Sequence, residues 1–133
     1  MDWLALAAAA LSCLVVGFVW YNPKVFGNAW MKSLGLNEED LKKGNMALIF
    51  GLAFVLALLA AWFIDFMVSG HPPEDLNFGH GLFHGAMLGA VTVLPAMATN
   101  ALFERRSFTY IAINVLYWIV CFALMGGILI VWK

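Results

Sequence analysis

The stretch NFGHGLFHGAMLGAVTVLPAMATN, Asn77–Asn100, decides the fold predicted for this chain. It is apolar and long enough to cross the hydrocarbon core of a bilayer, which takes about 20 residues of helix. It also carries two histidines one helical turn apart and a series of glycines at every fourth position. The stretch therefore predicts a transmembrane helix with both a packing face and ionisable groups.

The composition of the whole chain agrees with a membrane protein. Of its 133 residues, 64% are hydrophobic and 11% are charged, and the mean hydropathy is +0.89. A soluble domain of this length could not enclose so much apolar surface, so lipid must be part of its solvent. We expect no nucleic-acid partner, because the net charge is −1 and no basic patch alternates with aromatic residues.

Four segments are long enough to span a bilayer: residues 3–21, 46–69, 78–102 and 108–132. They should be helices, since only a helix satisfies its own backbone hydrogen bonds in lipid. The predicted fold is an all-α integral membrane protein, a single transmembrane domain over residues 1–133, built as an antiparallel bundle of four transmembrane helices.

The first connection, residues 22–45, has helical order of its own. After Pro23, apolar residues recur at helical spacing opposite polar ones, which predicts a short interfacial helix with Phe26 and Trp30 on its apolar surface. Asn37 is expected to cap a short acidic helix. Asn45 and Ser107 are expected to cap the second and fourth spans.

The cationic residues predict the orientation. The first and third connections share one side of the bundle and hold six of the seven Lys and Arg residues: Lys24, Lys32, Lys42, Lys43, Arg105 and Arg106. Only Lys133 lies on the other side. Because Lys and Arg in short loops favour the cytoplasm, we expect both termini to be extracytoplasmic.

Two motifs resemble a family of small bacterial membrane proteins. They are GFVWYNP at residues 17–23, with FGNAWMK at 26–32, and NALFERRS at residues 100–107. The chain is identified as a member of domain-of-unknown-function family seventeen sixty-one. The resemblance implies a compact protein with about four transmembrane helices in a bacterial inner membrane, and it implies no activity or catalytic residue.

His80 and His84 are the main candidates for a site, together with Asp65 at a similar depth on the second span. Two imidazoles four residues apart on a helix can share one metal ion, and the carboxylate could be a further ligand. The same three groups could handle protons or a small ion. Alternatively, they could only make hydrogen bonds between helices, because they lie close to the interface.

The histidine pair cannot bind haem from both sides, because axial ligands approach opposite faces of the ring. Haem would need His71 from the second connection or a histidine of another subunit. No cofactor is therefore implied, apart from the metal ion that His80 and His84 could share. The motifs of hydrolases and transferases are missing, so we expect no enzyme activity.

Two further groups of residues have mainly structural interpretations. Gly81, Gly85 and Gly89 form a face of small residues that lets another helix approach closely, within the protomer or between protomers. Pro95 is expected to kink the third span, with Thr92 or Thr99 satisfying nearby backbone. Near the cytoplasmic end we expect an inner polar cluster: Asn100, Glu104, Asn114 and Tyr117.

The functional hypotheses are consequently broad. The first is a homo-oligomeric channel or transporter for a small ion, proton or polar solute, with Asp65, His80 and His84 as an outer site. The second is a non-catalytic scaffold or partner subunit that binds through Phe26 and Trp30. Metal or haem binding is a third.

Overall fold

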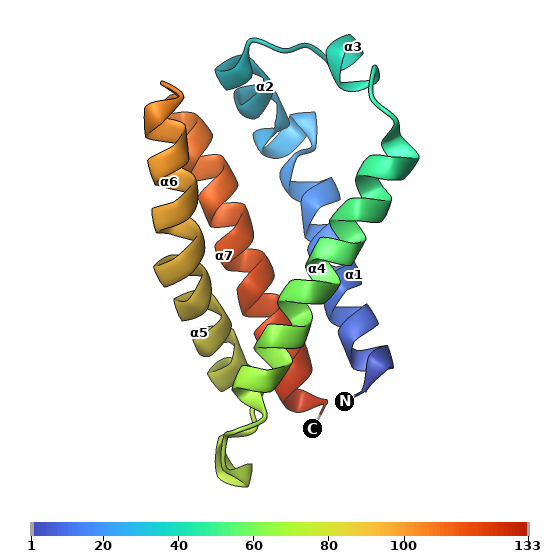
Figure 1. Ribbon diagram of the computed structural model, residues 1–133, viewed down its shortest axis with the longest axis vertical. Helices are drawn as coiled ribbons and strands as arrows, with labels where there is room; N and C mark the ends of the chain where they lie inside the picture. Colours follow the sequence, from blue (N-terminus) through green and yellow to red (C-terminus); the bar gives the residue numbers. More distant parts are fainter. Residues whose placement is uncertain (1, 133) are drawn as a thin grey trace.

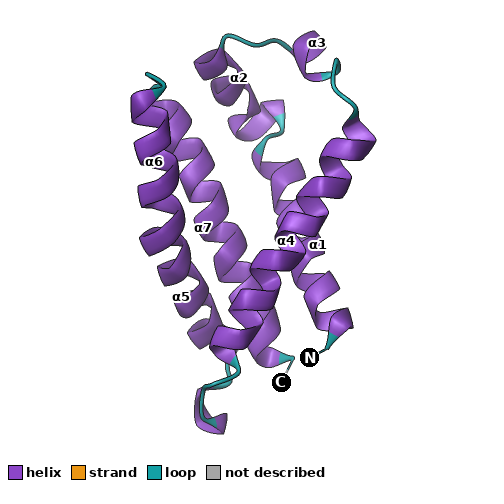
Figure 2. Cartoon of the chain, viewed as in Figure 1, coloured by secondary structure: helices purple, strands orange, loops and turns teal. Residues whose placement is uncertain are grey.

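The computed structural model describes residues 2–132, and this part of the chain consists of helices and connecting loops without a strand (Figure 2). The helices are α1 (Trp3–Trp20), α2 (Asn28–Leu34), α3 (Glu38–Leu41), α4 (Met46–Val68), α5 (Phe78–Leu88), α6 (Leu94–Phe103) and α7 (Phe108–Val131). The predicted all-α class is confirmed.

Four helical segments are long and apolar enough to cross a membrane: α1, α4, the α5–α6 segment Phe78–Phe103, and α7. Each agrees with a predicted span to within one residue at either end. Side chains that cap the first turns fix these boundaries. As predicted, Asn45 accepts a hydrogen bond from the Leu48 N–H at 3.2 Å, and Ser107 accepts one from the Tyr110 N–H at 3.1 Å.

A turn of π-helix, Gly89–Val93, divides the third segment into α5 and α6. Pro95 follows it in the first turn of α6. Proline lacks an N–H and its ring clashes with the carbonyl four residues earlier, and the wider π-turn accommodates this irregularity. The hydroxyl of Thr92 donates to the Leu88 carbonyl at 2.5 Å, so the expected disturbance by Pro95 takes the form of a π-turn.

The first connection forms a π-helical turn, Pro23–Gly27, which continues into α2. Gly35 ends α2 with φ 70°, a left-handed conformation that favours glycine. Asn37 caps α3 as predicted: its side chain accepts from the Asp40 N–H at 2.9 Å, and Asp40 accepts from the Asn37 N–H at 3.1 Å. The end of α2 and the start of α3 therefore fall at residues suited to those positions.

The glycine face of α5 packs against α7 within the same chain. A Cβ atom added at Gly81 would collide with the Gly126 carbonyl, and one at Gly85 would collide with the Phe122 carbonyl. At Gly89 the nearest α7 atom, the Ile119 Cα, would lie 3.2 Å away. Of the two alternatives left open by the sequence, the structure thus has the glycine face buried inside the protomer.

Helices α1, α4 and α7 enclose the hydrophobic core. Its largest fully buried side chains are Leu6, Ile64, Val68, Met125, Leu129 and Ile130. Polar contacts join α1 to α7 beside it: the Tyr21 hydroxyl donates to Asn114 Oδ1 at 2.5 Å, and the Tyr117 hydroxyl donates to the Cys13 carbonyl at 2.9 Å. Asn114 and Tyr117 therefore act as interhelical hydrogen-bonding groups.

The two ends of the bundle are occupied by different segments. Figure 1 shows the two termini and the connection from α4 to α5 at one end, and α2, α3 and the turn from α6 to α7 at the other. Lys24, Lys32, Lys42, Lys43, Arg105 and Arg106 belong to the second end, and Asp2, Glu74 and Asp75 belong to the first. Lys133, which was counted at the first end, lies outside the described residues.

Candidate metal centre

His71 comes after α4, separated from it by Ser69 and Gly70, and is held by the end of that helix. Its backbone N–H donates to the Val68 carbonyl at 3.3 Å, and its ring Nδ1 lies 3.2 Å from the same oxygen. Because a carbonyl can only accept, Nδ1 carries the proton of this contact. The neutral ring then has the lone pair on Nε2, which faces α5.

His80 and His84 lie on the first turns of α5, about 100° around the helix from the glycine face. Asn77 caps this helix, with its side chain accepting from the His80 N–H at 2.8 Å. Gly81 and Gly85, each next to a histidine in the sequence, hold α5 against α7. The same packing that fixes the rotation of α5 therefore turns both imidazoles toward the end of α4.

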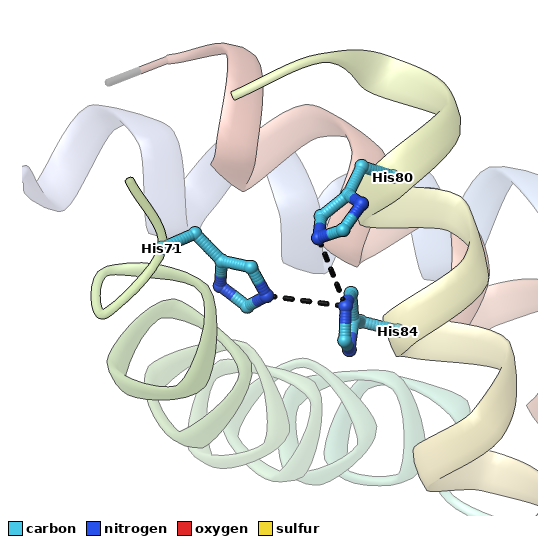
Figure 3. A group of neighbouring side chains, drawn as sticks. All are labelled: His71, His80 and His84. Atoms are coloured by element: carbon cyan, nitrogen blue, oxygen red, sulfur yellow. Dashed lines mark hydrogen bonds between the residues drawn. The ribbon is translucent and has the colours of Figure 1, made fainter. Parts of the chain in front are cut away.

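The three imidazoles meet at their Nε2 atoms (Figure 3). The Nε2 of His84 lies 3.1 Å from that of His71 and 3.0 Å from that of His80. Ligand atoms from all three side chains lie within 4.8 Å of one another. Two nitrogens bound to one tetrahedral zinc ion at the usual Zn–N distance are about 3.3 Å apart. The two separations from His84 are close to this value, and a small rotation of the His71 and His80 rings would bring all three nitrogens around one ion.

Hydrogen bonds between three neutral imidazole rings account poorly for this arrangement. A ring nitrogen has either a proton or a lone pair, so Nε2 of His84 cannot make separate linear hydrogen bonds to both neighbours. A proton on that atom would be divided between two acceptors, whereas a metal ion accepts three lone pairs at once. The contact from His71 Nδ1 to a backbone carbonyl is also the usual outer contact of a metal-binding histidine.

The site lies at the rim of the bundle and not in its interior. All three histidines are partly buried. The ring of Phe83 stands edge-on to His84, with ring centroids 5.5 Å apart. Asp75, in the connection between α4 and α5, is close enough to interact electrostatically with His84. An ion from the surrounding water could thus reach the nitrogens beside a negative side chain.

Asp65, which was expected to share this site, is not one of the converging ligands. Among residues 2–132, the group of converging ligand atoms consists of His71, His80 and His84, and Asp65 is not a member. Asp65 is only 7% exposed and continues the row of buried α4 residues that contains Ala57 and Ala61. Its side chain therefore belongs to the face of α4 that packs into the bundle.

The predicted inner polar cluster is divided between two places. Asn114 and Tyr117 are buried against α1, as described above. Asn100 and Glu104 are exposed and line a shallow pocket of about 160 Å³ beside Tyr110. The four residues do not form a single vestibule.

The predicted interfacial surface is also partly used inside the protein. Trp30 is partly buried, and its ring packs edge-on against Tyr21 with centroids 5.0 Å apart. Phe26 packs on Trp20 at 4.7 Å and remains 39% exposed. The two aromatic side chains thus contact the end of α1 and also remain partly exposed.

Haem does not suit the histidine site. Its axial ligands must stand on opposite sides of a planar ring, whereas the three Nε2 atoms converge on one point. His71, which the sequence suggested only as a haem ligand, is instead the third member of a compact group. The available signal was that all three histidines of the chain lie within residues 71–84.

A family model described as "Protein of unknown function (DUF1761)" matches residues 4–130, nearly the whole chain. No curated protein and no solved structure matches the chain.

Proposed function

We propose that this chain, which belongs to the family of unknown function DUF1761, is an integral membrane protein that binds a divalent transition-metal ion through His71, His80 and His84. The single observation that supports metal binding is the convergence of ligand atoms from these three side chains within 4.8 Å. In the proposal, Nε2 of each ring is a ligand and water occupies the remaining position.

Membrane insertion is supported by the outward side chains of the long helices. Large apolar residues such as Leu56, Leu59 and Phe66 on α4 are more than 60% exposed. Four such helices, each long enough to cross a bilayer, would expose an apolar surface that only lipid can solvate. We propose that the four segments cross the membrane as an antiparallel bundle.

The charges at the two ends support an orientation. Six cationic side chains lie at the end with α2 and α3, and such residues favour the cytoplasm. We therefore propose that the termini and the histidine site face the extracytoplasmic side of a bacterial inner membrane. The metal ion would then be taken from outside the cytoplasm.

The donor set favours particular metals. Imidazole nitrogen suits zinc, copper and nickel, whereas magnesium and calcium bind oxygen ligands. Zinc is the simplest probe because it has no redox chemistry and accepts three histidines with one open position.

Binding and transport make different demands on the bundle. Next to the site, the core side chains Ile64, Val68 and Leu129 are 0% exposed and fill the interior of the protomer. Passage of an ion through one protomer would require these residues to separate. If the protein is a transporter for a small ion, as the sequence suggested, the proposal places the path between copies in a homo-oligomer.

Calorimetry on purified protein tests the proposed site. The protein is purified with a tag free of histidine, treated with a chelator and titrated with zinc. We expect one zinc ion per chain, and at least about a tenfold loss of affinity (about 1.4 kcal/mol) in each of His71→Ala, His80→Ala and His84→Ala. Glu74→Gln, which changes an exposed acid in the same connection, is the matched control and should bind like the parent.

Two results would contradict the proposal. One is zinc binding that persists when all three histidines are replaced. The other is equal affinity for magnesium, since this ion prefers oxygen ligands.

A further inference from the structure

A larger cavity lies at the end of the molecule opposite the histidine site, where the end of α1, α2, α3 and the start of α4 meet. Its volume is about 510 Å³, within the range of pockets that hold small ligands. The lining is mostly apolar and carries two charged side chains. The residues are Tyr21, Pro23, Met31, Glu38, Leu41, Lys42 and Met46.

The two charges of this cavity are not neutralised by each other. Glu38 and Lys42 are four residues apart on and just after α3, a spacing at which helical side chains often pair. Nevertheless, the one ion pair among residues 2–132 joins Lys43 to Asp40 at 3.2 Å. A carboxylate and an ammonium group are thus both available to a ligand that carries two opposite charges.

We propose that this cavity binds the headgroup of a zwitterionic aminophospholipid, one with phosphoethanolamine. Its phosphate is held by Lys42 and its primary ammonium by Glu38. Met31, Leu41 and Met46 contact the glycerol backbone and the first methylene groups. The proposal rests on the membrane insertion proposed above, but not on the metal site.

The surroundings favour a lipid over a small soluble zwitterion. Met46 begins α4, and the residues that follow it, Leu48 and Ile49 among them, are apolar and exposed. Acyl chains that leave the cavity would continue along this surface. The segments that line the cavity, α2, α3 and the start of α4, are at the cation-rich end (Figure 1), which is the level expected for headgroups of the inner leaflet.

Neighbouring residues on and just after α3 provide matched controls. Glu38→Gln and Lys42→Gln each remove one charge from the cavity lining. Glu39→Gln and Lys43→Gln remove the same charges one position along the chain, from residues outside that lining. Effects of net charge are therefore common to both pairs, while Lys43→Gln additionally removes the exposed ion pair with Asp40.

Native mass spectrometry, on protein taken from nanodiscs of mixed lipids, measures the retained lipid. We expect phosphatidylethanolamine to be retained over phosphatidylcholine by about tenfold, because the quaternary choline has no N–H to donate to Glu38. Glu38→Gln and Lys42→Gln should each abolish this preference, while Glu39→Gln and Lys43→Gln keep it.

Other outcomes would overturn the proposal in recognisable ways. Equal retention of both lipids, or equal effects of cavity and control variants, would mean that the cavity selects no headgroup. A preference for phosphatidylglycerol that depends only on Lys42 would identify an anionic-lipid site instead. A protein that stays monomeric in buffer without detergent would overturn membrane insertion itself, whereas loss of zinc binding alone would leave the lipid site unaffected.

Discussion

Helix α5 has two faces of different chemistry, and each contacts a different neighbour. On one face Gly81 and Gly85 bring the backbone so close to α7 that a methyl group would collide with a carbonyl. On the other face His80 and His84 reach His71 at the end of α4, and the contact consists of ring nitrogens. The glycine contact leaves no space for a ligand, whereas the histidine contact directs lone pairs toward one point.

Because of this difference, one face of α5 serves the folding of the protein and the other face serves the proposed metal binding. Apolar packing of small residues positions α5 without help from the histidines, because close approach is what holds helices together in lipid. The polar face can then be used for a ligand. Two consequences can be measured: stability without metal should depend on the glycine face, and the gain in stability with metal should depend on the histidine face.

The largest effect is expected from Gly85→Leu. The new side chain would meet the Phe122 carbonyl and the Ala123 Cα, which belong to backbone and cannot move aside. We expect a loss of about 3 kcal/mol or more in the free energy of unfolding, measured by thermal denaturation of the metal-free protein in detergent. Gly85→Ala should lie between the leucine variant and the parent, which keeps the comparison informative if the leucine variant does not fold.

Gly51→Leu is the matched control for this substitution. Gly51 lies inside α4, and a Cβ atom there would meet nothing within 4 Å. Its replacement should leave the protein as stable as the parent or more so, since glycine inside a helix costs about 0.5–1 kcal/mol relative to alanine. Equal melting of the two glycine variants would show that the contact with α7 does not hold α5.

The next effect concerns the histidine face. At a free zinc concentration about 100 times its Kd, a ligand that binds only the folded state adds about 2.7 kcal/mol of stability. The parent protein should therefore melt at a higher temperature with zinc than with magnesium. His84→Ala removes the central nitrogen of the group and should abolish the difference, while its metal-free melting stays near that of the parent. A large loss of metal-free stability in this variant would show that the histidines are needed for folding.

The same comparison shows which features of the fold could be predicted from the sequence and which could not. The four spans were predicted to within one residue because hydropathy is an average over about 20 residues and tolerates local error. The glycine series correctly predicted a packing face but not its partner. Gly126, which opposes Gly81, lies 45 positions away in the sequence, and such pairing depends on the tertiary arrangement.

The converging ligand atoms include His71 and not Asp65, which shows the limit of arguments from depth. Asp65 was placed by counting residues along the helix axis, which says nothing of the direction in which a side chain points. A usable signal was present, since Asp65 follows Ala61 and Ala57 at intervals of four, on the row of small residues that faces the bundle. His71 could not be placed, because the path of the connection containing Pro72 and Pro73 determines where it lies.

The smallest effect should come from Asn77, which orients the histidine face indirectly. Its side chain accepts from the His80 N–H at 2.8 Å, and loss of such a cap costs about 1 kcal/mol. Asn77→Ala should lower stability by that amount and also weaken zinc binding, although less than His84→Ala, because the first turn of α5 would no longer hold His80 in place. Asn45→Ala is the matched control, since Asn45 caps α4 in the same way at the opposite end of the molecule. It should cost similar stability and leave the zinc affinity unchanged, and equal zinc affinities in the two variants would exclude a positioning role for Asn77.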